Sequence, residues 1–172
     1  PEVHYPGNKK PSTQDENFAE LAQWIKDKKA PVGSDLGEYL YPKLASGDAG
    51  TRQETQGKKA AEAFQDLLDE KLKSPTGKKR TLFIHAANEH FDQYGRLLTY
   101  IAPNYSTKEL ETMSLKERAT FNLFLVESGW AAAFPIYPSI PRISDLTLLQ
   151  EAAQNAYENR LGIWADPLTL TG

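Results

Sequence analysis

Residues 91–101 decide the fold and have the sequence Phe91-Asp92-Gln93-Tyr94-Gly95-Arg96-Leu97-Leu98-Thr99-Tyr100-Ile101. The run Leu97–Ala102 is rich in β-forming residues, and so is the earlier run Thr81–Ala87. The segment that joins them, residues 88–95, is polar apart from its aromatic side chains. Two such runs with this connection predict an antiparallel pair of strands with a longer hairpin loop.

Helical periodicity flanks this hairpin in the sequence. Apolar side chains recur at intervals of three and four residues in four segments, 14–29, 58–72, 120–128 and 145–161. Residues 31–56 are rich in Gly, Ser and Asp and are predicted to form a long loop with one short helix near 36–44. Because helices clearly outnumber strands, the predicted fold class is α+β.

Individual residues mark the ends of these helices. Thr13 and Glu16 have the spacing of a capping box at the start of the first helix. Ser144 is predicted to cap the last helix, and Gly129 has the position of the residue that follows a helix C-terminus.

The composition excludes several classes of protein. The chain has 172 residues, with 20 Lys and Arg against 23 Asp and Glu, so its net charge of −3 argues against a generally basic nucleic-acid-coating protein. It has no cysteine, which excludes disulfides, thiolate metal sites and cysteine nucleophiles. No apolar run approaches the roughly 18 residues of a membrane-spanning helix. The basic runs at 58–59 and 78–80 are interpreted as solvated charge at the ends of elements.

Three ordered blocks resemble the staphylococcal-nuclease-like (thermonuclease) domain family. Residues 91–101 resemble the family's hairpin "D-x-Y-G-R-x-L-x-Y", and residues 121–131 are similar to its helix "V-N-x-x-L-V-x-x-G-x-A". Residues 161–164 resemble the family's closing "G-I-W", and the helix at 58–72 fits the family's helix after the third strand.

The resemblance implies an OB-fold barrel of five strands packed with three helices. Residues 1–172 would then form a single, partial domain that lacks the first three barrel strands. Two large insertions are expected, at 7–56 with one amphipathic helix and at 103–118. The chain begins with Pro1 rather than Met, so we expect it to be cut just before a catalytic glutamate.

The resemblance also implies calcium-dependent hydrolysis of DNA or RNA phosphodiesters, as by an endonuclease. The family's hairpin arginine corresponds to Arg96, which would stabilise charge on the phosphate, since a guanidinium binds two oxygens at once. Glu2, in Pro1-Glu2, corresponds to the family's glutamate and would orient or deprotonate the attacking water. The alternative for Arg96 is a surface ion pair with Asp92 or Glu89, and for Glu2 a solvated terminal carboxylate.

Two tyrosines are candidate substrate contacts. Tyr137 corresponds to a family position where an aromatic ring stacks on a base, and Tyr94 lies beside Arg96 in the sequence. The alternatives are that Tyr137 packs its own proline loop and that Tyr94 fills the hairpin. Asn122 matches a family asparagine and is interpreted as structural.

No metal site is predicted within the chain. Asp35, Asp48, Asp92 and Asp145 are scattered, and the spacing of His85 and His90 fits no ligand motif. The Ca²⁺ that the resemblance implies would have most of its ligands upstream.

The implied partners are a DNA or RNA substrate and the missing N-terminal strands as a separate fragment, with no membrane. The chain alone is expected to be inactive. A second hypothesis is a degenerate, non-catalytic module that binds nucleic acid or protein. In a third, the insertions create an architecture that closes without the missing strands.

Overall fold

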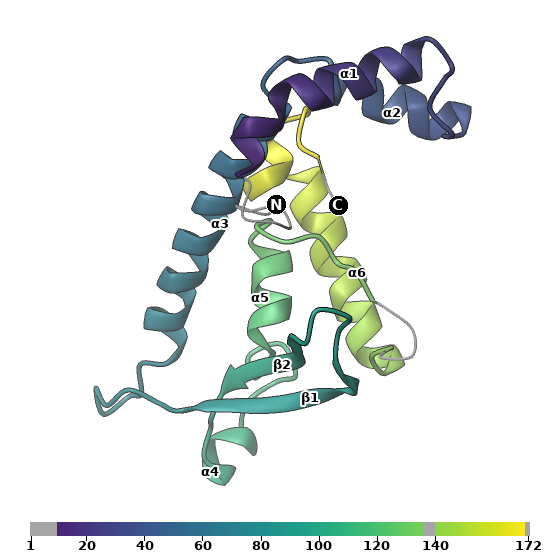
Figure 1. Cartoon of the computed structure of the whole chain (residues 1–172). Coiled ribbons are helices and arrows are strands. Elements are labelled where there is room, and N and C mark those ends of the chain that lie inside the picture. The colour runs from purple at the N-terminus through teal and green to yellow at the C-terminus, as the bar shows by residue number, and fades with distance from the viewer. Residues whose placement is uncertain (1–9, 136–139, 171–172) are drawn as a thin grey trace. The chain divides into compact units, whose positions relative to one another are not determined.

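The computed structural model of the chain describes residues 10–135 and 140–170, apart from the side chains of residues 87–89. The elements in chain order are η1 (Pro11–Gln14), α1 (Asp15–Lys26), α2 (Ser34–Leu44), α3 (Ala49–Lys71), β1 (Leu82–Phe91), β2 (Leu97–Pro103), α4 (Thr107–Leu110), α5 (Phe121–Glu127), α6 (Ile143–Glu158) and η2 (Gly162–Ala165) (Figure 1). This mixture of helices with one antiparallel sheet confirms the α+β class. The described residues form two compact units, one up to Glu62 together with those from Gly162, the other Ala63–Leu161.

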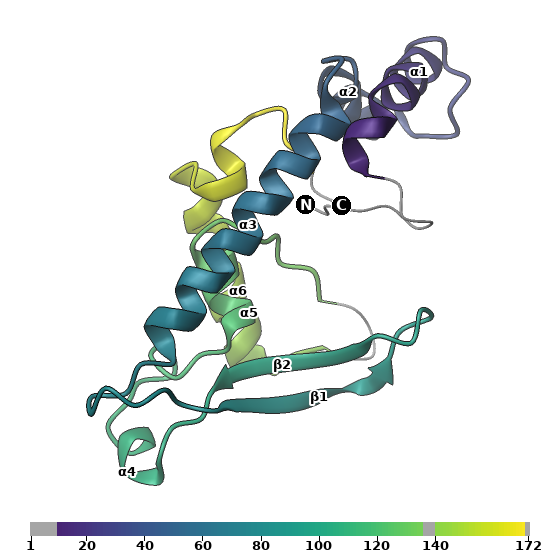
Figure 2. The same cartoon turned by 60° about the vertical axis from the view of Figure 1, so that its left-hand side comes forward.

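The predicted hairpin is the sheet of the Ala63–Leu161 unit. β1 and β2 pair antiparallel from Leu82 opposite Pro103 to Ala86 opposite Thr99, and the register shifts before Phe91. Figures 1 and 2 show the two strands side by side along their length. Within the described residues the sheet has two strands. Both strands and their pairing are therefore confirmed.

Aromatic packing forms the core of this unit. Phe121 of α5 is 1% exposed, and its ring meets those of Phe64 and Phe124 edge to face, with centroids 5.9 and 6.2 Å apart. Leu72 and Leu123 are buried in the same cluster. Because Phe64 belongs to α3 and Phe121 to α5, this cluster packs the C-terminal part of α3 against α5, the helix that contacts β2.

The ends of α5 follow the sequence prediction. Thr120 caps the helix by accepting a hydrogen bond from the N–H of Leu123. Gly129 has φ +77° after the C-terminus, and a Cβ there would lie 2.4 Å from the carbonyl oxygen of Leu161. Glycine at this position is therefore required both by the left-handed backbone and by the close approach of the chain.

Two predicted caps are wrong. Arg142, not Ser144, is the N-cap residue of α6, and no side chain caps that helix. Thr13 bonds the carbonyl of Lys10 within η1 instead of forming a capping box with Glu16. A capping box does occur at α4, where the side chain of Ser106 accepts from the N–H of Glu109 and that of Glu109 accepts from the N–H of Ser106.

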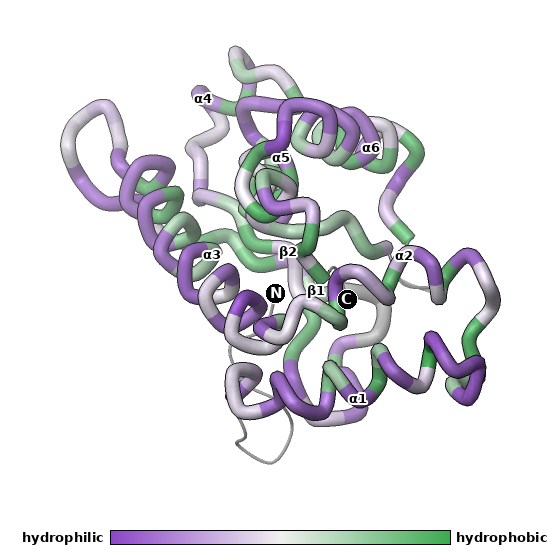
Figure 3. Tube along the Cα trace, turned by 90° about the horizontal axis from the view of Figure 1, so that it is seen from above, coloured by the Kyte–Doolittle hydropathy of each residue, from purple (hydrophilic) through white to green (hydrophobic). Residues whose placement is uncertain are grey.

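The other unit begins with α1 packed on α2. Gly37 of α2 lies close to α1, since a Cβ there would be 3.3 Å from the side chain of Ile25. Figure 3 shows α1 alternating between hydrophilic and hydrophobic colours, as its amphipathic sequence predicts, and α3 mostly in hydrophilic colours. α2 confirms the short helix predicted near 36–44.

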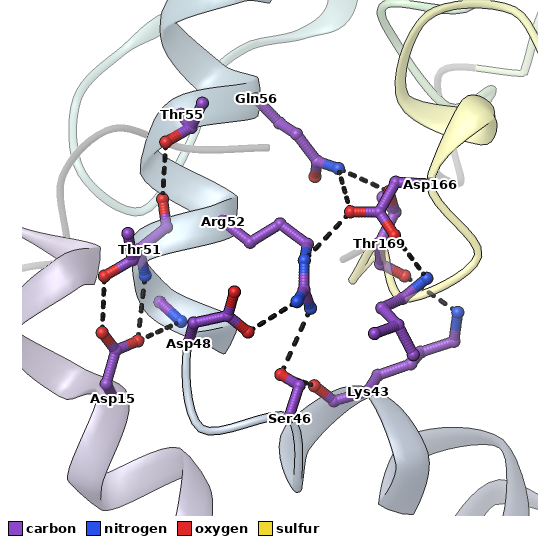
Figure 4. A network of polar contacts seen from close by, with 12 residues as sticks. Asp15, Lys43, Ser46, Asp48, Thr51, Arg52, Thr55, Gln56, Asp166 and Thr169 are labelled. Atoms are coloured by element: carbon purple, nitrogen blue, oxygen red, sulfur yellow. Dashed lines mark hydrogen bonds and ion pairs between the residues drawn. The ribbon is translucent and has the colours of Figure 1, made fainter.

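The helix predicted at 58–72 begins nine residues earlier than expected, at Ala49. Its first turn is capped by a residue from another helix, because Oδ1 of Asp15 accepts from the N–H groups of Gly50 and Thr51 at 2.7 and 2.9 Å (Figure 4). Gly50 is needed at this contact, since a Cβ there would lie 2.0 Å from the carbonyl oxygen of Pro11.

Buried polar groups hold the C-terminal segment in this unit. The ammonium of Lys43 is buried and donates to the carbonyl oxygens of Pro167 and Thr169 at 2.6 and 3.0 Å (Figure 4). Arg52 of α3 pairs with Asp166 at 2.9 Å. The segment after η2 is thus attached to α2 and α3. Among the described residues, no helix combines the length and the apolar character needed to cross a membrane.

Candidate functional site

The candidate site lies at the turn of the hairpin and is organised by Asp92. Its Oδ1 accepts from the backbone N–H groups of Tyr94 and Arg96, both at 2.9 Å. Gly95 has φ +76°, a left-handed conformation that glycine adopts without strain. The Asp-x-Tyr-Gly-Arg sequence therefore forms a closed turn in which the carboxylate of its first residue replaces backbone acceptors.

The same carboxylate holds the guanidinium of Arg96. Nε of Arg96 donates to Oδ2 of Asp92 at 2.6 Å. The side chain of Arg96 is 69% exposed whereas that of Asp92 is 17% exposed, so the pair has a shielded anion and an accessible cation. The N–H of Arg96 is the main cause that lowers the pKa of Asp92, followed by its side chain and the N–H of Tyr94.

Tyr94 belongs to the same cluster. The guanidinium carbon of Arg96 lies 5.4 Å from the centre of the Tyr94 ring, within the range of a cation–π contact. Tyr94 is 65% exposed. A planar cation and a flat ring side by side at a turn are suited to bind a phosphate together with a neighbouring base.

The structure thus brings together two of the four predicted site residues. Arg96 and Tyr94 are in contact, and the pairing of Arg96 with Asp92 that was weighed as an alternative is present. Glu2 and Tyr137 lie outside the described residues.

The described residues do not fit a calcium site. Across residues 10–135 and 140–170, no group of three His, Asp or Glu side chains is placed to hold a metal ion. Asp48 pairs with Arg52 instead, and Asp92 is engaged by Arg96.

Asn122 has the structural role predicted for it. Its Oδ1 accepts from the backbone N–H of Ile101 at 3.3 Å. The bond attaches the first turn of α5 to β2, the strand that begins directly after Arg96. Asn122 therefore helps to hold the hairpin against its helix.

One polar cluster was missed in the sequence. Arg80 was interpreted as solvated, but its side chain is 11% exposed, pairs with Glu109 and lies 5.1 Å from the ring of Tyr105. Burial raises the pKa of Tyr105. Neighbouring Lys79 is 69% exposed and follows the prediction. No local pattern marked Arg80, because its partners follow it by more than twenty residues.

Comparison with known proteins identifies the family. The sequence model of the staphylococcal nuclease homologue family matches residues 41–166, well over half of the chain. The match starts within the segment 7–56 and includes the whole of the hairpin, α5 and α6. No individual curated protein matches the chain. The chain therefore belongs to the staphylococcal nuclease homologue family.

Proposed function

We propose that the protein hydrolyses phosphodiester bonds of DNA or RNA. Membership of a family whose members are generally nucleases supports a nuclease-like function. The observation that carries the proposal is the turn at residues 92–96, which presents an exposed guanidinium whose orientation is fixed by Asp92.

The chemistry of the reaction requires such a cation. Negative charge builds on the non-bridging oxygens of the phosphorus during attack by water, and fixed positive groups stabilise it. A guanidinium such as that of Arg96 is cationic and has a planar array of donors. Its attachment to a short turn before a strand reduces the entropy lost when it binds phosphate.

Further roles are proposed for residues that the resemblance identified. Glu2 would orient the attacking water or take its proton. Tyr94 and Tyr137 would stack on bases beside the scissile bond, a contact worth roughly 1–3 kcal/mol per base. Of these three, Tyr94 lies among the described residues, in contact with Arg96.

The exposed face of the hairpin supports an incomplete barrel. Leu82 and Ile84 lie on one face of β1 and are 42% and 57% exposed, and Phe83 on the opposite face is 55% exposed. Exposed apolar side chains on one sheet face are typical of a surface that another element covers. We propose that further barrel strands cover this face, either in the full-length protein or as a separate fragment. Residues 7–56 and 103–118 would then be insertions added to the barrel. Without the covering strands, residues 1–172 are proposed to be inactive alone.

Hydrolysis by the full-length protein is also proposed to depend on calcium. Since the described residues offer no group of ligands for the ion, we propose that its ligands lie outside them. Removal of calcium with a chelator should then abolish hydrolysis by the full-length protein without altering the hairpin of this chain.

The experiment is a hydrolysis assay with fluorescent single-stranded DNA and RNA. Full-length protein and residues 1–172 are compared in calcium and in excess EGTA. We expect calcium-dependent cleavage by the full-length protein and none by residues 1–172. Binding of nucleic acid without cleavage by the full-length protein under any condition would instead support the non-catalytic module.

A further inference from the structure

A cavity separate from the turn at residues 92–96 lies in the unit formed by residues 63–161. Its volume is about 500 Å³, and the hairpin, α5 and α6 all contribute to its lining. Small-molecule sites in proteins commonly have volumes of roughly 300–1,000 Å³. Neither Arg96 nor Tyr94 lines this cavity.

The lining is rich in hydrogen-bond donors and cations. His85 and Tyr100 are opposite each other in the strand register and so share one face of the hairpin. Arg118 and Arg142 approach from the segments that precede α5 and α6. Among the described residues that line the cavity, Asp145 is the acidic one. The two arginines therefore leave the lining with an excess of positive charge.

Among the described residues, neither of these two arginines has a carboxylate partner. Arg52, Arg80 and Arg96 each form an ion pair, but within the described part of the chain no Asp or Glu pairs with Arg118 or Arg142. An arginine at a cavity without such a partner is available to an anionic ligand.

Arg142 also lies at the start of a helix, where the helix dipole attracts anions. It is the N-cap residue of the 16-residue helix α6, at the positive end of the helix dipole. A cation is unfavourable there, and Ser, Thr, Asp or Asn is preferred at an N-cap. A bound anion would remove this conflict, because it would interact favourably with both the guanidinium and the helix.

The remaining walls suit a ring system. Leu123 and Leu148 provide apolar surface, and Tyr100 provides an aromatic ring. Since Oδ1 of Asn122 is occupied by the N–H of Ile101, the amide nitrogen is the part of that side chain left to donate. Apolar and aromatic walls beside two guanidinium groups match a phosphate ester attached to a flat ring.

We infer that this cavity binds a nucleoside monophosphate, with Arg118 and Arg142 holding its phosphate. This goes beyond the proposed hydrolysis, because it assigns a second nucleotide site that does not use Arg96. It concerns binding alone, so it is tested without measuring cleavage.

The test is calorimetric titration of residues 1–172 with adenosine 5′-monophosphate. We expect saturable binding that is about tenfold or more weakened in each of the variants Arg118→Gln and Arg142→Gln, because each loses a charged hydrogen bond. Adenosine and inorganic phosphate should each bind more weakly than the nucleotide.

Three controls make the result decisive. Arg160→Gln removes an arginine that lies outside the cavity, so this variant should bind as the unchanged chain does. Arg118→Lys and Arg142→Lys keep the positive charge and should bind the nucleotide better than the Gln variants do. Near-ultraviolet circular dichroism verifies that each variant is folded.

The inference is overturned by an absence of saturable binding, or by Arg118→Gln and Arg142→Gln variants that bind like the unchanged chain. Loss of binding in Arg96→Gln alone would place the nucleotide at residues 92–96 instead. Equal affinity for inorganic phosphate would reduce the cavity to a simple anion site.

Discussion

Nε of Arg96 lies 2.6 Å from Oδ2 of Asp92, and the other oxygen of the same carboxylate accepts the backbone N–H of Arg96 at 2.9 Å. One side chain therefore determines both the shape of the turn and the direction of the cation. This double attachment explains why an exposed arginine at a loop is suited to a task that requires fixed geometry.

Asp92→Asn separates these two functions. Asparagine retains an oxygen that accepts the N–H groups of Tyr94 and Arg96, so the turn should persist, but the ion pair is lost. We expect the full-length protein to lose less hydrolytic activity with this change than with removal of Arg96. The turn is checked by the amide chemical shifts of Tyr94 and Arg96, and activity equal to that of the unchanged protein would contradict the positioning role.

Gly95 tests the backbone of the same turn. It has φ +76° and no atom lies within 4 Å of the position of a Cβ, so a substitution there is opposed by conformation rather than by a clash. Gly95→Asn should cost little, whereas Gly95→Val should cost about 1–2 kcal/mol or open the turn. Urea unfolding of both variants measures the difference, and equal stabilities would contradict it.

Gly50→Ala addresses the contact between η1 and α3. A Cβ would lie 2.0 Å from the carbonyl oxygen of Pro11, so the backbone must move and the bonds from Asp15 to the first turn of α3 must lengthen. We expect destabilisation of about 1–3 kcal/mol. Gly33→Ala is the control, because nothing lies within 4 Å of its Cβ position. Similar unfolding midpoints for the two variants would be inconsistent with this contact.

The carboxylate of Glu54 should make the stability of the folded chain depend on pH. The ammonium of Lys58 and the hydroxyl of Ser12 lower the pKa of its carboxyl from 4.5 to about 2. A lowered pKa stabilises the folded state fully above pH 4.5, and this contribution is lost as the pH falls through about 2. The melting temperature of Glu54→Gln should be below that of the unchanged chain at neutral pH and approach it on acidification. A constant difference across this range would rule the effect out.

The elements that the sequence predicted well are those determined locally. The hairpin depends on Gly95 and on alternation within a few residues, and α5 depends on Thr120 and Gly129 at its two ends. The early start of α3 was missed, because its first turn is capped by Asp15, 35 residues earlier in the chain. Arg80 was misjudged for the same reason, since Glu109 is 29 residues away.

For the candidate site too, the part formed by a short local motif could be predicted from the sequence. Arg96 and Tyr94 belong to one short motif, so their contact followed from the motif. Arg118 and Arg142 carried no local signal, because the hairpin and two helices must pack before the cavity exists. Long-range packing is what a single sequence shows least.

The role of Arg96 in hydrolysis is measured by the turnover of single-stranded DNA by full-length protein in calcium, with Arg96 unchanged or replaced. Arg96→Ala should reduce kcat by about 10²–10³-fold, the usual effect of losing one donor to developing charge. Arg96→Lys should recover only part of that loss, since an ammonium does not bind two oxygens in a plane. Arg160→Ala, an arginine elsewhere in the same unit, should leave kcat unchanged. A kcat for Arg96→Ala within twofold of that of the unchanged protein would contradict a catalytic role for Arg96.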